Sequence, residues 1–257
     1  LTKLFTATAI GMLLDEGLLP SLDAPVHPFL NGWDTGDKAK VTLRHILTHT
    51  SGLKYIQGGT GLEEAEDAVK FASELPLEYA PGAVWAYNNS AVMLLAAVIQ
   101  RAAGRRADEF LKENFFEPLA FSRSVWHSDA AGNPYVHGAL ELTPLDLAKF
   151  GQLWLDKGDW RGRCLISEAY VDQATTSAAS VAPQQGLLWE RLGESLPWEQ
   201  PWSGFWMTGS DGQVLMVFPQ KRLVCVQMVR RQLTNEEEHR GLSRFIWNAL
   251  DLARSAQ

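Results

Sequence analysis

The sequence predicts an α+β fold in which an antiparallel sheet is flanked by helices and joined to a mainly helical region. Three observations predict this class. Residues 1–18 have the spacing of an amphipathic helix, helical patterns recur to about Ala179, and short apolar strand patterns follow from Ser180 onward. We therefore expect a central helix over 1–18, a mainly helical region over 19–179, and a sheet with a closing helix over 180–257.

The composition is that of a globular protein with an acidic excess. The chain has 257 residues and a net charge of −7, with charges of both signs interspersed, so no basic stripe of the kind that binds nucleic acid is present. No apolar run approaches the ~20 residues of a membrane span. Cys164 and Cys225 match no metal pattern and are too few for a disulfide scaffold. We expect no cofactor, no nucleic-acid partner and no membrane span.

The first predicted helix begins with a lysine in an apolar setting. Lys3 stands at the head of a stripe formed by Ala7, Ile10 and Leu14 and so points toward a core. Desolvation favours the neutral form of lysine, which can act as a base. The alternative, favoured on this segment alone, is a lysine whose amine extends back to water.

A second helix is predicted from Leu43 to about Ser51, with Thr42 as its N-cap. On it, His45 and His49 lie four residues apart, a spacing that can hold a metal ion. No third ligand is evident, so structural hydrogen bonding is the favoured role of both histidines.

A polar turn precedes an apolar helix that is predicted over 91–103. The turn contains Tyr87, Asn88, Asn89 and Ser90. One interpretation is a helix N-cap supplied by Asn89 or Ser90. The other is a tyrosine and an amide directed into a cleft.

The remaining elements follow from the same signals. Further helices are predicted over 62–74, 107–116, 144–155 and 167–174, with a loop over 122–135. Strands are predicted over 186–189, 205–209, 214–218 and 223–229, with a polar loop over 190–202. A closing helix capped by Asn235 is predicted over 236–254.

Three separated features together match a known motif set. They are Lys3 at the start of an apolar helix, Tyr87 and Asn89 before a second one, and the strand segment Met207–Ser210. In this order they resemble the serine β-lactamase and penicillin-binding-protein superfamily. The resemblance is closest to its class C β-lactamase, esterase and D-peptidase branch, which includes enzymes that cleave nylon oligomers.

The likeness extends to residues 43–53 and 142–151 and covers nearly the whole chain. It implies the β-lactamase/transpeptidase-like fold, whose sheet would include strands upstream of Leu1. The first motif of the branch is Ser-x-x-Lys. With Lys3 as its lysine, the nucleophilic serine is expected immediately before Leu1, and the chain as given does not contain it.

The resemblance also implies a role for each matching residue. The serine would attack an ester or amide carbonyl and form an acyl-enzyme. Lys3 would accept or relay its proton, and Tyr87 would return a proton to the leaving group, with its phenolate favoured by a nearby ammonium. Asn89 would hold Lys3 or a substrate amide. The Ser210 backbone N–H would form half of an oxyanion hole.

Met207 departs from the pattern of the branch. Many relatives have a lysine or histidine there, beside the substrate-binding Thr208 and Gly209, and that cation binds a substrate carboxylate. Its loss costs roughly 1.5–3 kcal/mol, which favours neutral substrates unless Arg222 or Arg230 supplies the charge. Apolar cleft wall and ordinary core are both open roles for Trp85, Trp126, Trp189 and Trp206.

We therefore expect a serine hydrolase that acts on a small ester or amide through an acyl-enzyme. Two alternatives stay open. One is a catalytically silent relative that binds a ligand in the same cleft, and the other is a penicillin-binding protein or D-peptidase. The physiological substrate and the compartment, bacterial cytoplasm or periplasm, stay open as well.

Overall fold

The computed structural model describes residues 1–56, 61–192, 203–230 and 234–255. Its helices are α1 (Thr2–Asp15), α2 (Leu43–Leu47), α3 (Ala68–Glu74), α4 (Asn89–Met93), α5 (Leu95–Ala103), α6 (Ala107–Leu111), α7 (Pro144–Leu155), α8 (Glu168–Thr175) and α9 (Asn235–Ser255). Its strands are β1 (Ser124–Trp126), β2 (Leu140–Leu142), β3 (Asp159–Trp160), β4 (Arg163–Cys164), β5 (Glu190–Leu192), β6 (Gly204–Gly209), β7 (Gln213–Phe218) and β8 (Leu223–Gln227). Of the helices described, none is long and apolar enough to cross a bilayer.

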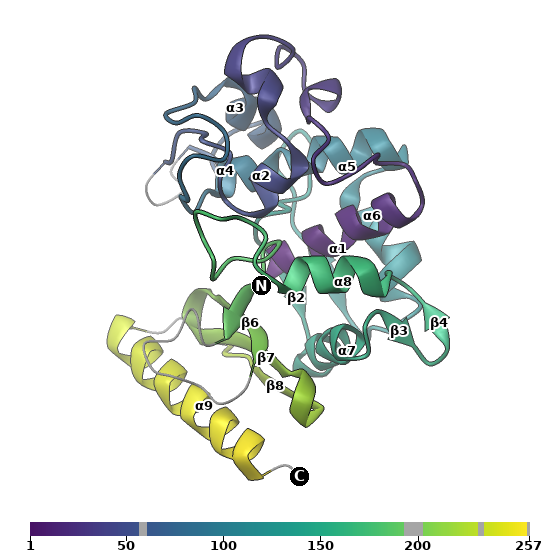
Figure 1. The fold of residues 1–257 in the computed structure, drawn as a ribbon, viewed down its shortest axis with the longest axis vertical. Coiled ribbons are helices and arrows are strands. Elements are labelled where there is room, and N and C mark those ends of the chain that lie inside the picture. The colour runs from purple at the N-terminus through teal and green to yellow at the C-terminus, as the bar shows by residue number, and fades with distance from the viewer. Residues whose placement is uncertain (57–60, 193–202, 231–233, 256–257) are drawn as a thin grey trace.

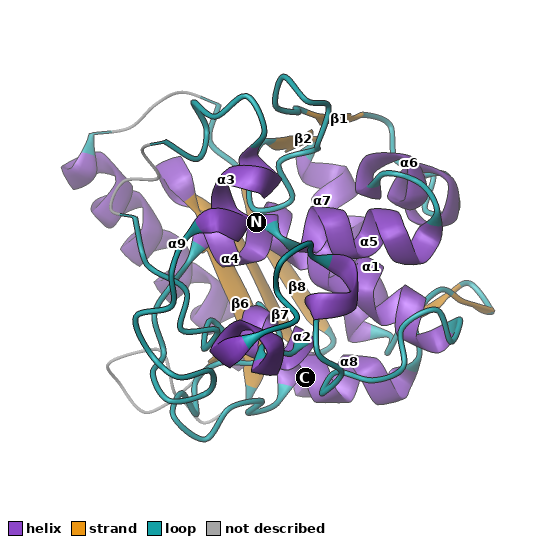
Figure 2. Cartoon of the chain, turned by 90° about the horizontal axis from the view of Figure 1, so that it is seen from above, coloured by secondary structure: helices purple, strands orange, loops and turns teal. Residues whose placement is uncertain are grey.

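The main sheet is an antiparallel meander in the order β5-β6-β7-β8. Side chains alternate between its two faces. Met207 and Leu215 face the large core that α1 and α7 share, whereas Trp206 and Met216 face α9. Figure 1 shows α9 along the outer side of the sheet, and Figure 2 shows the strands between α9 and the other helices. The predicted α+β class, with a sheet between helices, is confirmed.

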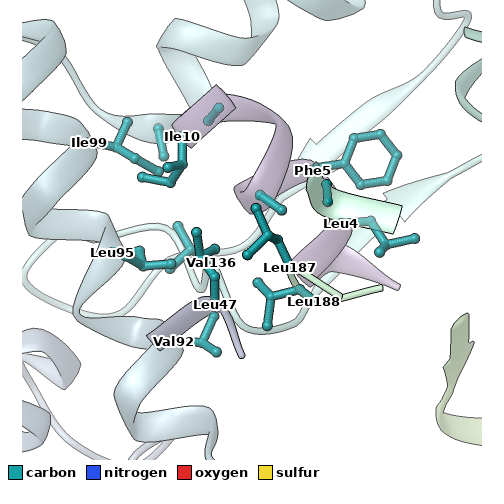
Figure 3. Packing of buried hydrophobic residues seen from close by; sticks show 14 of the residues in the cluster. Leu4, Phe5, Ile10, Leu47, Val92, Leu95, Ile99, Val136, Leu187 and Leu188 are labelled. Atoms are coloured by element: carbon teal, nitrogen blue, oxygen red, sulfur yellow. The ribbon is translucent and has the colours of Figure 1, made fainter. Parts of the chain in front are cut away.

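Helix α1 is central and is not amphipathic, contrary to the prediction. All residues from Thr2 to Leu13 are buried. Helices α5 and α6 contact it, and its Phe5 ring lies 4.2 Å from the ring of Phe150 on α7. Figure 3 shows side chains of other segments packed around it. A helix buried all round belongs to a core, so Lys3 is buried whichever face it occupies.

Some predicted boundaries are wrong because tertiary packing overrides local signals. Residues 186–189 are an irregular, buried segment rather than a strand, and the adjacent predicted loop begins with β5. The rest of that loop, 193–202, lies outside the described residues. The loop predicted over 122–135 contains β1. The helix predicted over 62–74 is confined to α3, because the Asp67 side chain caps it by accepting from the Lys70 N–H.

The N-caps show the same limited precision. Thr42 and Pro144 start α2 and α7 as predicted. Asn88, rather than Asn89 or Ser90, caps α4. Before α9, Thr234 and Glu237 hydrogen-bond each other reciprocally, so a capping box replaces the predicted Asn235 cap.

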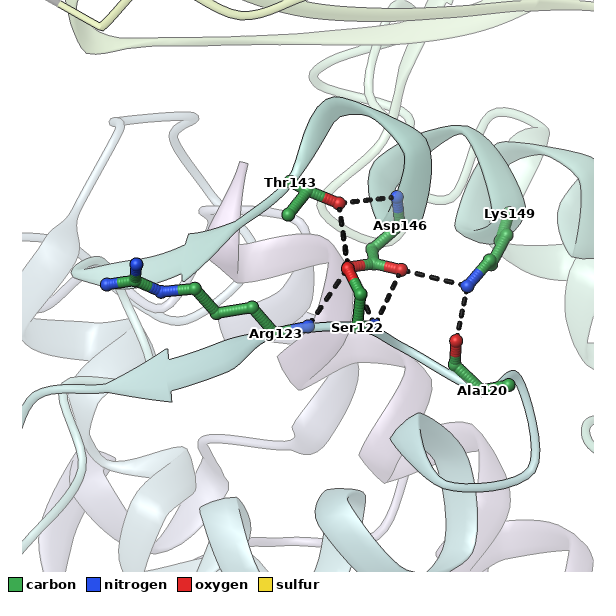
Figure 4. Close-up of polar contacts among 6 residues, drawn as sticks. All are labelled: Ala120, Ser122, Arg123, Thr143, Asp146 and Lys149. Atoms are coloured by element: carbon green, nitrogen blue, oxygen red, sulfur yellow. Dashed lines mark hydrogen bonds and ion pairs between the residues drawn. The ribbon is translucent and has the colours of Figure 1, made fainter.

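Asp146 anchors the start of α7 with a fully buried carboxylate. Its hydrogen-bond donors are the backbone N–H groups of Ser122 and Arg123, Ser122 Oγ at 2.7 Å, Thr143 Oγ1 at 2.7 Å and Lys149 Nζ at 2.9 Å (Figure 4). Burial alone would raise the pKa of this carboxyl. The hydrogen bonds, led by those from Ser122 and Lys149, outweigh burial and hold its pKa well below the usual range.

Candidate active site

Lys3 is a buried amine with one hydrogen-bond partner among the described residues. Its Nζ donates to the His137 carbonyl oxygen at 2.8 Å and lies 4.9 Å from the centre of the Tyr87 ring. Burial lowers the pKa of Lys3 to about 7, although the carboxylate of Glu63 acts in the opposite direction. A large fraction of the amine is therefore neutral at pH 7, and the neutral form is the one that accepts a proton.

A short loop lies along α1 and fixes its first turns. Thr6 Oγ1 donates to the Val136 carbonyl oxygen at 2.6 Å, and Thr2 Oγ1 accepts from the Leu140 N–H at 3.2 Å. The contact of Lys3 with the same loop lies between these two. Backbone groups therefore position the lysine, and no carboxylate in the described part of the chain is hydrogen-bonded to it.

His137 is a neutral imidazole next to Lys3. Burial, followed by the nearby lysine charge, lowers its pKa to about 4. Its Nε2 lies 3.7 Å from the Glu63 carboxylate, which is too long for a hydrogen bond. Its Nδ1 is buried without a partner in the described part of the chain. Sequence reasoning missed this residue, because a lone histidine in a loop carries no motif.

His49 packs against the Tyr87 ring, with centroids 4.8 Å apart. It follows the end of α2 with φ of +57°. The prediction that it shares a helix with His45 is therefore wrong. Its Nδ1 accepts from the Asn88 N–H at 3.2 Å, which assigns the ring proton to Nε2. Burial lowers its pKa to about 3. The structural role predicted for both histidines is confirmed, since His45 Nδ1 accepts from the Thr42 N–H.

Tyr87 stands where this buried cluster meets the surface, with 42% of its area exposed. Burial raises the pKa of its phenol, and Tyr55 and Glu190 raise it further. The phenol therefore stays protonated at neutral pH, which differs from the phenolate suggested by the resemblance. In this form Tyr87 is a proton donor.

The two asparagines after Tyr87 have different environments. Asn88 is fully engaged, because its Oδ1 accepts from the Ala91 N–H at 2.9 Å and its Nδ2 donates to the Leu53 carbonyl at 2.7 Å. Asn89 Oδ1 is buried with no partner among the described residues. Lys3 donates to a backbone carbonyl instead, so Asn89 has a spare acceptor for a ligand.

The end of β6 meets the start of α1. A Cβ atom built on Gly209 would lie 3.1 Å from the Leu1 nitrogen, so a side chain there would require Leu1 to shift by a few tenths of an ångström. Thr208 is half-buried, and Ser210 is exposed in the turn after the strand. Met207 is 6% exposed and packs in the core beside α1. The first and third motifs are therefore neighbours in space.

Of the two arginines considered as a replacement cation, Arg222 is at the wrong end of the sheet. It pairs with Asp156 at 2.6 Å, in the turn between β7 and β8. Arg230 follows β8 at the same end as Ser210 and is exposed. The tryptophans also separate: Trp189 and Trp206 are core residues, whereas Trp85 is 37% exposed and Trp126 half-buried.

A groove of about 370 Å³ opens beside Tyr87. Its lining residues are Leu53, Tyr55, Glu78, Tyr79, Ala86 and Tyr87. A smaller cavity of about 90 Å³ near α6 includes none of the motif residues. Sequence reasoning missed Tyr55, Glu78 and Tyr79, although exposed tyrosines outside any apolar periodicity were the available signal. In the described part of the chain, no group of three or more His, Cys, Asp or Glu side chains is arranged to hold a metal ion.

The sequence profile of the Beta-lactamase family matches residues 1–247. The chain therefore belongs to the Beta-lactamase family.

The chain is similar to proteins with different described activities. Over 202 residues the chain is 26% identical to a Bacillus subtilis protein provisionally described as penicillin-binding protein PbpX, covering 69% of this chain and 49% of that protein. Over 124 residues it is 34% identical to Esterase EstB of Burkholderia gladioli, covering 40% of this chain and 31% of the esterase. The chain thus spans half or less of the length of these two relatives.

A solved structure from Bacillus anthracis, provisionally described as a 6-aminohexanoate-dimer hydrolase, superposes with a TM-score of 0.81. The alignment covers 99% of this chain and 72% of that one at 19% identity. At this identity the likeness is one of fold, and it agrees with the β-lactamase/transpeptidase-like fold implied by the motifs.

Proposed function

We propose that this chain belongs to a serine hydrolase that cleaves esters or amides without a substrate carboxylate, through an acyl-enzyme. The observation that carries the proposal is the buried Lys3 amine, which lies 4.9 Å from the centre of the Tyr87 ring, on a helix whose preceding residue Leu1 lies beside the β6 end. A lysine with a pKa lowered to about 7 is a competent proton acceptor at neutral pH.

In the proposed mechanism, a serine joined to the Leu1 nitrogen supplies the nucleophile. Its hydroxyl proton passes to the neutral Lys3 amine as the oxygen bonds to the substrate carbonyl carbon. The negative charge that develops on the carbonyl oxygen is stabilised by backbone N–H groups at the serine and at Ser210. Tyr87 donates a proton to the departing alcohol or amine, and the resulting phenolate is reprotonated from the Lys3 ammonium. Water then hydrolyses the acyl-enzyme.

Met207 supports a substrate that does not depend on a carboxylate. Its thioether lies in the β6 position that a cation occupies in many relatives, and it provides no charge for a substrate carboxylate. The similarity to an esterase and to a penicillin-binding protein is compatible with either an ester or an amide bond.

The experiment is fluorophosphonate labelling of the full-length protein, followed by peptide mapping. We expect one adduct, on a serine joined directly to Leu1, and no adduct in a Lys3→Met variant. A protein that folds but takes no adduct would instead be a ligand-binding relative. Acylation by benzylpenicillin that persists for hours would identify a penicillin-binding protein.

A second arm measures the role of Tyr87. Tyr87→Phe removes only the phenolic hydroxyl, and we expect ester turnover to fall more than about tenfold because the proton donor is lost. The Tyr135→Phe variant is the matched control: it removes a hydroxyl that donates to the Glu63 carbonyl outside the groove and should keep most of the turnover. Unchanged turnover in Tyr87→Phe would remove this hydroxyl from the chemistry.

A further inference from the structure

The groove beside Tyr87 is rigidly built. Segment 52–54 pairs with segment 76–79 through the Lys54 N–H to the Pro76 carbonyl at 2.9 Å and the Glu78 N–H to the Gly52 carbonyl at 2.8 Å. Gly52 has φ of +74°, and a Cβ there would lie 2.1 Å from the Tyr79 carbonyl oxygen. A side chain at this position would force the two segments apart, so the walls of the groove are set by the backbone.

The remaining wall, formed by the segment that carries Ala86 and Tyr87, is also held by backbone hydrogen bonds. The Ala86 N–H donates to the His49 carbonyl at 2.8 Å, and the Gly82 N–H donates to the Thr50 carbonyl at 2.7 Å. The Asn88 amide ties this wall to the first one by donating to the Leu53 carbonyl. The groove is therefore formed before any ligand binds, as small-molecule sites usually are.

The chemistry of the lining is unusual for a protein surface. Tyr55 is 47% exposed, Tyr79 49% and Tyr87 42%, so three tyrosines surround one opening. Aromatic rings at this exposure provide both apolar surface and a negative ring face that attracts cations. Lys3 already lies over the Tyr87 ring from the interior side of the site.

Glu78 is the one charged residue among those that line the groove. Its side chain is exposed, and no ion pair or side-chain hydrogen bond engages it within the described residues. Lys54 alternates with the lining residues Leu53 and Tyr55 along an extended segment and so points away from them. The groove therefore has an available negative charge and no positive side chain in its described lining.

We infer that this groove binds an ammonium-bearing group of the substrate, with Glu78 as the counter-charge and the three tyrosines as cation-binding walls. The inference deepens and rests on the proposed function, because the groove opens at Tyr87. It names the substrate class as esters or amides that carry a positive charge outside the scissile bond. The lack of a cation at Met207 and the net charge of −7 also favour a positively charged substrate over a negatively charged one.

The test is an equilibrium titration of the full-length protein with three small probes, followed by NMR. Benzylamine is protonated at pH 7, benzyl alcohol is neutral and phenylacetate is negative, and all three carry one phenyl ring. We expect benzylamine to bind about tenfold tighter than benzyl alcohol, and its affinity advantage over phenylacetate to be larger still. The NMR signals of the groove tyrosines should shift on binding.

Two variants assign the preference to the groove. Glu78→Gln should reduce the preference for benzylamine over benzyl alcohol about fivefold or more, and Tyr79→Leu should weaken benzylamine binding about threefold. The control is Glu117→Gln, which makes the same charge change at an exposed position behind α6 and should leave the three affinities unchanged.

Equal affinity for the three probes, tighter binding of phenylacetate, no binding at all, or an unchanged preference in Glu78→Gln would each overturn the inference. The titration needs no catalysis. A preference for benzylamine in a protein that forms no fluorophosphonate adduct would reject the proposed hydrolase function and support the cation-binding groove. An adduct without a charge preference would reject the groove and keep the hydrolase.

Discussion

Asp146 and Lys3 are both buried, ionisable side chains near helix starts, and their surroundings are opposite. The Asp146 carboxylate accepts hydrogen bonds from backbone, hydroxyl and ammonium groups, and these favour its charged form. Lys3 donates to one carbonyl among the described residues, and the Glu63 carboxylate only partly offsets the effect of burial, which works against its charge. The first arrangement holds a charge in place, and the second makes a charge easy to lose.

The neighbours of the two residues differ in the same way. Near Lys3 or Tyr87, the atoms Asn89 Oδ1, His137 Nδ1 and His49 Nε2 are buried with no partner among the described residues, as are the ring N–H groups of three core tryptophans. Unpaired buried polar groups cost stability. We therefore expect Asp146 to contribute to the stability of the fold, whereas the proposed function gives Lys3 a role in the chemistry.

The largest expected effect is on catalysis at Lys3. In full-length protein, Lys3→Met should lower kcat/KM for a neutral ester by about 10³-fold, because the proton acceptor is lost. Met fills similar apolar volume, so near-ultraviolet circular dichroism should match the wild type. A variant that keeps more than a tenth of the activity would contradict the role of Lys3.

The same variant should not lose stability. The folded-state pKa of Lys3, about 7, lies below its unfolded value of 10.5. The unfolded state thus holds more protons between these values, so the cost of burying Lys3 is fully present below pH 7 and is recovered as pH rises toward 10.5. We expect urea unfolding at pH 6 to give Lys3→Met equal or higher stability, and a smaller rise in stability between pH 7 and 9 than the wild type.

The opposite result is expected at Asp146. Asp146→Asn should lower the free energy of unfolding by about 3 kcal/mol, because buried donors and the Lys149 ammonium lose their anionic partner. Turnover per folded molecule should be unchanged. Asp156→Asn is the control: it removes the ionic partner of the exposed Arg222 from a half-buried position and should cost less than about 1 kcal/mol.

Acid should destabilise the Lys3 region through its histidines. Burial lowers the pKa of His49 to about 3 and of His137 to about 4, below their unfolded value of 6.5. Their contribution is fully present above pH 6.5 and is lost as pH falls toward 4, by about 2 kcal/mol each at pH 5. His49→Asn, which tolerates a positive φ, should reduce the loss between pH 7 and 5. An unchanged pH slope would contradict a neutral, buried His49.

The smallest effect is expected at Met207. Met207→Lys should improve hydrolysis of carboxylate-bearing esters about tenfold relative to neutral ones, since a charge-assisted hydrogen bond becomes available. Met207→Leu is the matched control and should change neither ratio. An unaltered ratio in the lysine variant would mean that this position does not contact the substrate.

Much of the fold was predictable from local patterns. The hairpin of β7 and β8, the strand β6 and the starts of α2 and α7 follow from alternation and capping residues. What failed depended on tertiary contacts: the apolar run at 186–189 is buried without pairing as a strand, and α1 is enclosed on all sides. Neither burial pattern is encoded in a local period.

The candidate site divides in a similar way. Lys3, Tyr87 and the β6 end were predicted from motif order, and the structure brings them together. His137 and the groove residues Tyr55, Glu78 and Tyr79 were not predicted, because they reach the site through irregular loops whose backbone pairing is non-local. Long-range backbone hydrogen bonds leave no spacing in the sequence to recognise.

The most direct test of the central claim is the titration of the Lys3 amine in the full-length protein. NMR of ε-carbon-13-labelled lysine gives one signal that is absent from Lys3→Met, and its midpoint is read against pH. The account predicts a midpoint near pH 7, in step with a rise in the rate of acylation by a neutral ester. A midpoint above pH 9.5, or acylation that does not follow it, would contradict Lys3 as the proton acceptor.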